Sequence, residues 1–276
     1  VPVRLEPDFV DGPSGRLFMQ VVVPAESPAI AAVLILPPIG EEMNKSRRML
    51  SLQAQNLANN GVVAILPDLY GLGDSEGTVA DASLEIWRAD LEHICARIFS
   101  AHKPQRLHLL GLRSGALFLS MVDPTRFSVK SWILWSPEKT GARTVKNLYR
   151  QALIAARSPS DSNISITELR EQTLRDGFIE VAGYQWPSAL IDALEHTDLP
   201  ESLPPGVDAD WIDVRPALDS NIAPDIPPVV RRWDESCRQV RYEVVDGPPF
   251  WQTAEISTVP ELIALTTANV VDARYG

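Results

Sequence analysis

Hydrophobic residues along the chain follow two patterns, short continuous apolar runs and longer segments with helical spacing. The continuous runs cover residues 31–36, 62–66, 106–112 and 131–137. Such runs are typical of strands that are covered by helices on both faces of a sheet. They predict a mostly parallel central sheet flanked by helices.

The segments between these runs predict the helices and the edge of the sheet. Two short extended runs, at residues 2–10 and 16–23, flank the turn formers of residues 11–15 and predict an antiparallel hairpin at one sheet edge. One helix is expected after residue 48, with Gly61 as its stop. The apolar positions expected to face inward are Leu50, Leu52 and Leu57 in that helix, and Leu84, Trp87, Leu91, Ile94 and Ile98 in a second helix over residues 83–99.

The alternation of strands and helices stops between residues 141 and 205. Polar helical stretches occupy this region, together with a short extended run. We therefore expect one core domain, formed by residues 1–140 and 206–276, and a helical lid of residues 141–205 inserted after the sixth strand. The elements expected after the lid are strands at residues 209–214 and 240–245, a helix around residues 228–237, and a terminal helix that opens near Pro260.

The composition and net charge of the chain exclude some classes of binding partner. The chain has 276 residues, 45% of them hydrophobic, and a formal net charge of -11. This acidity argues against nucleic acid and anionic membrane surfaces, and no apolar run reaches membrane-spanning length. Cys95 and Cys237 have no spacing typical of a metal or redox pair. With no targeting pattern at residues 1–4, we expect a cytoplasmic monomer or homodimer without metal or cofactor.

One motif organises the chain. The apolar run 106–112 leads into Gly111-Leu112-Arg113-Ser114-Gly115 and then into a further apolar helix. This frame fits G-x-S-x-G, the turn that holds a nucleophilic serine in strained backbone where a strand meets a helix. Arg113 stands where the serine should be, and a guanidinium stays protonated and has no lone pair to offer. Acyl-enzyme chemistry of the usual kind cannot start from it.

A second string supports the same fold. Residues 67–77 read Pro-Asp-Leu-Tyr-Gly-Leu-Gly-Asp-Ser-Glu-Gly. They resemble the P-D-x-x-G-x-G-x-S loop of the α/β-hydrolases, and the resemblance implies an α/β-hydrolase fold. The glycines permit a sharp turn, and the Asp and Ser side chains can satisfy local backbone N–H groups.

The other members of a catalytic triad are not where this fold needs them. Asp213 and Asp219 are candidates for the acid, although either can be a solvated carboxylate or cap. The histidine is expected just beyond the last strand, where residues 246–251 contain none. His196 lies in the predicted lid, and His108 lies within the strand before the elbow. Two of the three triad members are therefore missing from their expected positions.

Backbone donors and acidic side chains could still form a site. By position in the fold, Ile39 or Gly40 and Ser114 would supply oxyanion-hole N–H groups. For Ser114, we expect a side chain that points away from the apex and helps to cap or pack the elbow helix.

Arg113 has two interpretations. It can form an internal ion pair that fills the site, or it can anchor a substrate carboxylate, phosphate or sulfate. Its predicted partners are Glu41, Glu42 and Glu138, any of which could also act as a general base. The aromatic residues Trp135, Trp186, Phe250 and Trp251 would line an apolar wall of the pocket, unless they are plain core.

Four strings resemble one bacterial group, the exosortase A system-associated hydrolase 2 family. They are Pro37-Pro38 with Glu41-Glu42-Met43-Asn44-Lys45-Ser46-Arg47-Arg48, Leu66-Pro67-Asp68-Leu69-Tyr70-Gly71, Gly111-Leu112-Arg113, and Pro249-Phe250-Trp251. The resemblance implies a pathway linked to exopolysaccharide and PEP-CTERM sorting. Two hypotheses follow: a hydrolase of an anionic ester- or acyl-type small molecule, or a catalytically inactive member that binds a ligand or a protein partner.

Overall fold

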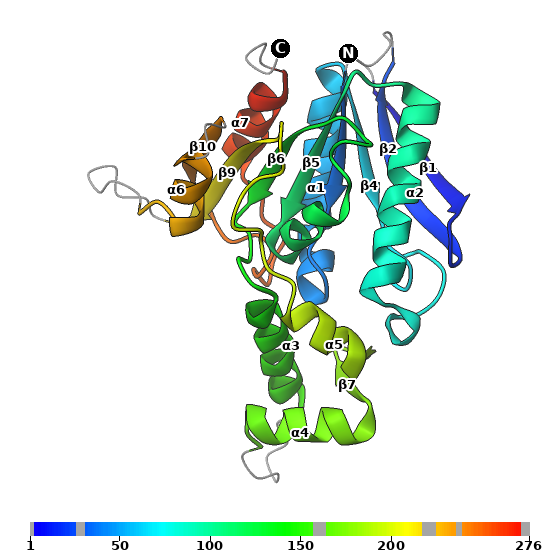
Figure 1. Ribbon diagram of the computed structural model, residues 1–276, viewed down its shortest axis with the longest axis vertical. Helices are drawn as coiled ribbons and strands as arrows, with labels where there is room; N and C mark the ends of the chain where they lie inside the picture. The colour runs from blue at the N-terminus through cyan, green and yellow to red at the C-terminus, as the bar shows by residue number, and fades with distance from the viewer. Residues whose placement is uncertain (1–2, 26–30, 157–163, 217–224, 236–238, 272–276) are drawn as a thin grey trace.

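An eight-stranded sheet forms the centre of the molecule (Figure 1). The computed structural model describes residues 3–25, 31–156, 164–216, 225–235 and 239–271. The strand order is β1-β2-β4-β3-β5-β6-β9-β10; β1, β2 and β4 pair antiparallel, and the remaining neighbours pair parallel. The strands are β1 (Val3–Asp11), β2 (Arg16–Pro24), β3 (Ala31–Leu36), β4 (Val62–Pro67), β5 (Arg106–Leu112), β6 (Val129–Trp135), β9 (Asp208–Arg215) and β10 (Val240–Asp246). The predicted mostly parallel sheet and its edge hairpin are confirmed.

Helices cover both faces of this sheet. Along β3, Leu34 and Leu36 pack in the cluster that includes helix α2 (Leu84–His102), and Val33 and Ile35 pack in the cluster that includes α1 (Glu41–Asn59). The first cluster also receives the 3-10 helix η2 (Arg113–Met121) and α6 (Pro228–Glu235), and the second receives α7 (Pro260–Val271). Successive side chains of a strand point to opposite faces, so a strand between two helical layers is apolar throughout.

Two predicted helices differ from the observed ones. Helix α1 begins at Glu41, so Glu41 and Glu42 form its first turn rather than a loop. Carboxylates in a first turn interact favourably with the helix dipole, which supports this early start. Leu52 is only partly buried, and the apolar helix after the elbow is a 3-10 helix rather than an α-helix.

A separate group of elements follows β6. Helices α3 (Gly141–Ala156), α4 (Ile166–Asp176) and α5 (Ser188–Glu195) and a hairpin of β7 (Phe178–Val181) with β8 (Tyr184–Pro187) lie beyond the carboxyl edge of the sheet (Figure 1, bottom). Leu148 and Leu190 of this group belong to the same apolar cluster as Leu36. The group occupies the predicted lid region; its role as a lid stays a prediction.

The loop of residues 67–77 is held by its own side chains. Asp68 accepts hydrogen bonds from the Asp74 N–H at 2.9 Å and from Arg47 Nη2 at 2.8 Å. Ser75 Oγ donates to the Asp68 carbonyl at 2.6 Å and accepts from the Phe18 N–H at 2.8 Å. The prediction that Asp and Ser side chains of this loop satisfy backbone groups is confirmed.

Several sequence predictions concern features other than the fold. Cys95 is buried in α2 as a free thiol, and Cys237 lies outside the described residues. In the part of the chain that the structure describes, no helix has the length and apolar character needed to cross a membrane. Within the same ranges, no group of three or more His, Cys, Asp or Glu side chains could hold a metal ion.

Candidate functional site

Arg113 occupies the apex of a strained turn between β5 and η2. Its φ of 54° lies in the left-handed region, which non-glycine residues rarely adopt. The glycines on either side are required by close packing: a Cβ on Gly115 would lie 2.3 Å from the Leu36 carbonyl oxygen, and one on Gly111 would lie 2.5 Å from Ala116 Cα. The frame proposed from the sequence, with Arg113 at its centre, is confirmed.

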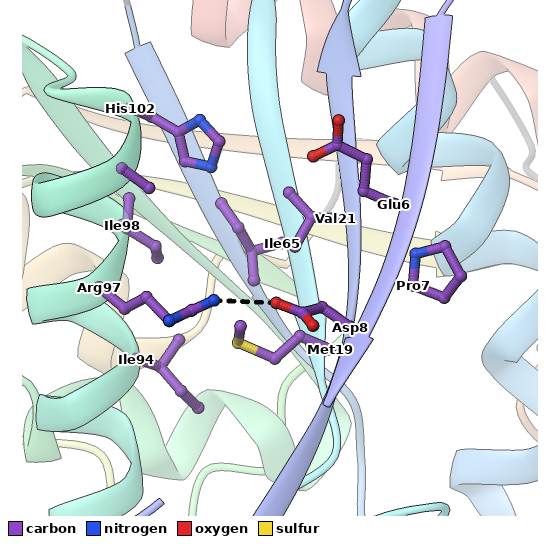
Figure 2. Close-up of a pocket in the computed structure, with 11 residues that line it drawn as sticks. Glu6, Pro7, Asp8, Met19, Val21, Ile65, Ile94, Arg97, Ile98 and His102 are labelled. Atoms are coloured by element: carbon purple, nitrogen blue, oxygen red, sulfur yellow. Dashed lines mark hydrogen bonds and ion pairs between the residues drawn. The ribbon is translucent and has the colours of Figure 1, made fainter. Parts of the chain in front are cut away.

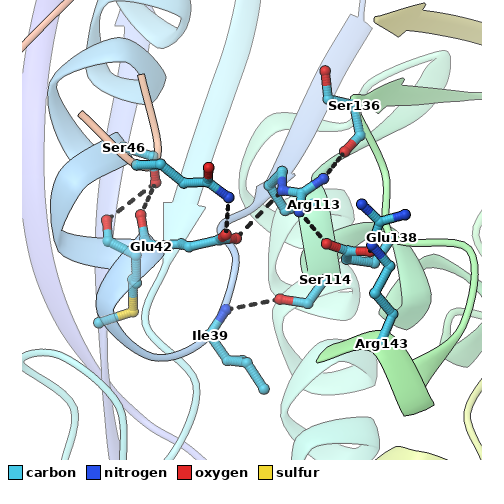
Figure 3. A network of polar contacts seen from close by, with 10 residues as sticks. Ile39, Glu42, Ser46, Arg113, Ser114, Ser136, Glu138 and Arg143 are labelled. Atoms are coloured by element: carbon cyan, nitrogen blue, oxygen red, sulfur yellow. Dashed lines mark hydrogen bonds and ion pairs between the residues drawn. The ribbon is translucent and has the colours of Figure 1, made fainter. Parts of the chain in front are cut away.

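The Arg113 guanidinium is surrounded by protein acceptors (Figure 3). Nη1 donates to the Ser136 carbonyl at 2.8 Å, and Nη2 donates to Glu138. Nε lies 3.4 Å from Oε2 of Glu42. Arg113 is only 8% exposed, and Trp251 lies under its guanidinium at 5.1 Å from the ring centroid. The predicted internal ion pair is confirmed for Glu42 and Glu138.

A second cation completes the network. Arg143, near the start of α3, places Nε 2.8 Å from Oε2 of Glu138, whose side chain is 3% exposed. Glu138 is therefore held between Arg113 and Arg143, and the four side chains of the network carry two positive and two negative formal charges. A buried carboxylate needs this kind of compensation, because desolvation of a lone charge is costly.

Glu41 takes no part in this network, contrary to expectation. Glu41 and Glu42 are neighbours in the first turn of α1, where consecutive side chains point in directions about 100° apart. Glu42 points toward Arg113, and Glu41 is exposed.

Burial raises the pKa of Glu42 above the ordinary value of 4.5. The positive charge of Arg113 and a hydrogen bond from Gln252 Nε2 at 3.4 Å oppose this shift, and the nearby charge of Glu138 adds to it. A carboxylate whose pKa is moved toward neutrality is a better proton acceptor than an ordinary glutamate.

The oxyanion-hole prediction needs a correction at Ile39. The Ile39 N–H donates to Ser114 Oγ at 3.0 Å, so the protein itself already uses this donor (Figure 3). The Ser114 hydroxyl thus ties the start of η2 to the loop after β3, in agreement with its expected packing role. Gly40, with φ 70°, precedes α1, and donor roles for its N–H and for the Ser114 N–H stay predictions.

The four predicted pocket aromatics do not form one wall. Trp135, Phe250 and Trp251 pack together, with ring centroids 6.3 Å apart for the first pair and 5.0 Å apart for the second. Trp135 Nε1 also donates to Thr266 Oγ1 at 2.9 Å. Trp186 lies on β8 in the other apolar cluster. Of the four, Trp251 is the ring that contacts the network around Arg113.

An open cleft lies beside the buried network. It has a volume of about 210 Å³ and lies between the start of α1, α3 and the segment after β10. We call it the α1–α3 cleft. Its charged lining comprises Glu41, Glu42, Lys45 and Arg150, and its remaining lining comprises Asn147, Gln151, Ile154, Trp251 and Gln252.

Sequence reasoning missed the cations Lys45, Arg143 and Arg150. Arg143 and Arg150 lie seven positions apart on α3, which is two helical turns and therefore one face. The seven-residue spacing is visible in the sequence. It indicates cations near Glu42 only when α3 is known to lie beside the first turn of α1.

The alternative triad members do not converge on Arg113. Asp213 is bonded to Trp211, Arg215 and Tyr242, and Asp219 lies outside the described residues. His196 is exposed, its Nδ1 2.8 Å from the carbonyl oxygen of Asp192, and that contact raises its pKa.

His108 is the other histidine considered from the sequence. It is buried beside Ser131, and burial lowers its pKa to about 3. It is therefore a neutral core residue, as expected.

Comparison with solved structures identifies the architecture. Over 96% of both chains, this chain superposes with a TM-score of 0.61 and 14% identity on Est1E from Butyrivibrio proteoclasticus, solved with ferulic acid bound. A serine hydrolase without a lid from Xanthomonas campestris matches with a TM-score of 0.53 and 15% identity over 98% of this chain and 96% of that one. The chain has the α/β-hydrolase fold.

Other proteins of the α/β-hydrolase fold match to a similar degree. The mouse α/β-hydrolase domain-containing protein 10 gives a TM-score of 0.55 at 14% identity, over 96% of each chain. A thioesterase domain from the curacin biosynthetic pathway gives 0.54 at 14% identity, over 98% of this chain and 100% of that domain. No family model and no curated protein matches the sequence.

Proposed function

We propose that the protein is a hydrolase of an anionic ester- or acyl-type small molecule, which binds in the α1–α3 cleft and is cleaved without a covalent intermediate. The observation that carries the proposal is the position of Glu42. It lines the cleft on one side, contacts Arg113 on the other, and has a raised pKa.

Glu42 acts as the general base in this proposal. Its carboxylate takes a proton from a bound water as the water oxygen attacks the carbonyl carbon of the substrate. The protonated Glu42 then gives the proton to the departing alkoxide or thiolate, and the acid product leaves. Arg113 positions the Glu42 carboxylate and does not itself hold substrate, because its Nη atoms already bond Ser136 and Glu138.

In this proposal, Lys45 and Arg150 bind the anionic group of the substrate. Both line the cleft, and both carry charges that complement a carboxylate, phosphate or sulfate. The polarising donors would be the N–H groups of Gly40 and Ser114. This assignment replaces the anchor role that the sequence suggested for Arg113.

The names of the structural relatives support an ester or acyl substrate. Est1E was solved with ferulic acid, and the curacin relative is a thioesterase domain. The strings at residues 37–48 and 249–251 resemble the exosortase A system-associated hydrolase 2 family. On that resemblance we place the activity in a bacterial pathway linked to exopolysaccharide and PEP-CTERM sorting.

A substrate panel with paired variants tests this function. The panel contains p-nitrophenyl esters and acyl thioesters, each with and without a terminal carboxylate. We expect turnover of the carboxylate-bearing members, a loss of about 10²- to 10⁴-fold in kcat for Glu42→Gln, and little change for the neighbouring Glu41→Gln. Fluorophosphonate should not inhibit. Inhibition with labelling of Ser114, or equal losses in the two variants, would refute the mechanism.

The second candidate is a non-catalytic protein that binds an anionic ligand in the same cleft. It is favoured by the contacts of the Arg113 guanidinium with Ser136, Glu42, Glu138 and Trp251, which leave little of it open to a substrate. In this case no member of the panel is turned over, but carboxylate ligands raise the melting temperature. Arg150→Gln should remove that rise while leaving the melting temperature of the free protein unchanged.

A further inference from the structure

A second cavity lies near the β1 edge of the sheet, and α6 and β10 lie at the other edge. It has a volume of about 320 Å³ and lies between β1, β2 and helix α2 (Figure 2). We call it the α2–β1 groove. Its volume is within the lower part of the range of small-molecule sites, roughly 300–1,000 Å³, and none of its lining residues belongs to the α1–α3 cleft.

The floor of the groove is apolar. Five buried side chains form it: Met19 and Val21 from β2, Ile65 from β4, and Ile94 and Ile98 from α2. These side chains are at most 8% exposed, so a ligand that places an apolar group on the floor contacts their outermost atoms and removes chiefly its own apolar surface from water.

The two walls of the groove carry opposite charges. On the β1 wall, Glu6 and Asp8 point into the groove, and on the α2 wall Arg97 and His102 face them (Figure 2). Asp8 and Arg97 form an ion pair across the groove at 2.9 Å, with about half of each side chain exposed. Glu6 also pairs with Arg4, which lies two positions earlier in β1 and therefore on the same face of the strand.

These exposed pairs are weak and can be exchanged for contacts with a ligand. An ion pair between exposed side chains contributes about 0–1 kcal/mol. Burial lowers the pKa of His102, which favours the uncharged ring, and an uncharged imidazole can still donate one hydrogen bond. Across the groove, Glu6 and Asp8 then lie opposite Arg97 and the His102 ring, and Arg4 lies beside Glu6 on the β1 side.

We propose that the α2–β1 groove binds a free apolar α-amino acid as its zwitterion. The ammonium group lies against Glu6 and Asp8, the carboxylate lies against Arg97 and the His102 ring, and the apolar side chain rests on the floor. A simple carboxylate would face two like charges, and a simple amine would leave Arg97 to compete for Asp8. A ligand with both charges can contact the two walls at the same time.

Calorimetric titration of the full chain with L-leucine tests this site. We expect saturable binding with a dissociation constant of about 1 mM or tighter, equivalent to roughly 4 kcal/mol. Leucinamide lacks the carboxylate, N-acetyl-leucine lacks the ammonium group, and glycine lacks the apolar side chain. Each should bind at least tenfold more weakly. Absence of binding at 10 mM L-leucine, or equal binding of leucinamide, would overturn the proposal.

Two variants and a matched control assign the binding to the groove. Asp8→Asn and Arg97→Gln each remove one charged wall, and each should weaken binding of L-leucine at least tenfold. Arg126→Gln breaks a comparable exposed ion pair, with Glu92, that lies outside the groove, and it should bind as the unaltered protein does. Unchanged melting temperatures would show that all three variants are folded. Undiminished binding by both Asp8→Asn and Arg97→Gln would place the ligand elsewhere and refute the assignment.

Discussion

The Arg113 side chain contacts two carboxylates, the buried Glu138 and the partly buried Glu42. It contacts Glu42 through Nε and Glu138 through Nη2, and Glu138 has a second partner in Arg143. Removal of Arg113 would therefore leave Glu42 as the group with the larger unpaired charge.

We expect Arg113→Met to destabilise the protein by about 3–5 kcal/mol at pH 7, the usual cost of breaking a buried pair from one side. The loss of stability should become smaller as the pH falls, because protonation of Glu42, whose pKa is already raised by burial, removes its unpaired charge. Denaturant titrations at several pH values measure both effects. The additional change Glu42→Gln should recover part of the stability, and a pH-independent loss would contradict the electrostatic explanation.

Another buried carboxylate lies under the loop of residues 67–77. Asp90 of α2 is fully buried, its Oδ2 accepts from the Tyr70 N–H at 2.9 Å, and burial raises its pKa from 3.8 to about 6. Because the folded protein holds this proton more tightly than the unfolded chain, stability should fall as the pH rises from about 4 to about 6.

Asp90→Asn should remove this pH dependence. The amide oxygen can still accept from the Tyr70 N–H, and no charge needs to be buried, so we expect the variant to be more stable than the unaltered protein by about 1–3 kcal/mol above pH 6. The difference should vanish near pH 4. Melting curves across this pH range measure it, with the exposed Asp234→Asn as control. A variant that is less stable at pH 7 would show that Asp90 is needed as a carboxylate.

At the scale of elements, the elbow depends on the contact between η2 and the end of β3. Gly115 allows this contact, since a Cβ there would meet the backbone oxygens of Leu36 and Pro37 at 2.3 and 2.6 Å. Backbone atoms of a central strand cannot move aside as a flexible side chain can.

We expect Gly115→Ala to destabilise the fold by at least about 2 kcal/mol, as overpacking in a dense core does. Gly61→Ala is the matched control, because Gly61 has a φ of 83° but an added Cβ would meet nothing within 4 Å. It should cost about 1 kcal/mol through backbone strain alone. Equal losses on denaturation would show that space at Gly115 is not limiting.

The elements that could be predicted are those whose signal is local. The runs at β3 and β4 are apolar throughout because both faces are covered, and the two loop motifs carry their own turn residues. The start of α1 could not be placed from the same pattern, because its first turn is polar. Because the helix begins at Glu41, Glu42 points toward Arg113 and Glu41 lies in solvent.

The candidate site was harder to predict because its contacts join distant segments. Gln252 approaches Glu42 from 210 positions away, and Arg150 reaches the cleft only through the placement of α3. Trp186 and Trp251 are alike in sequence terms, yet they pack in separate apolar clusters. Side-chain type alone does not say which layer of the fold a residue joins.

At the scale of the molecule, the 141–205 region and the sheet share one apolar cluster. Leu148, Tyr149 and Trp186 are buried in one cluster with Leu36 of β3 and Trp87 of α2, and Arg143 adds an ion pair to Glu138. A region packed in this way should not unfold before the rest.

We therefore expect a single calorimetric transition, with equal calorimetric and van't Hoff enthalpies. Trp186→Ala should lower the melting temperature without dividing the transition in two, because the substitution creates a cavity in the shared apolar core. An earlier, separate transition would show that residues 141–205 form an independent unit and would favour an opening lid.

The hydrogen bond between the Ser114 hydroxyl and the Ile39 N–H limits what a substitution at position 113 can achieve. A serine placed at position 113 alone would leave Glu42 without the cation that contacts it, would have no histidine in the loop after β10, and would face an Ile39 N–H that already donates to Ser114. A serine nucleophile at this turn would therefore need simultaneous changes in several separate segments of the chain.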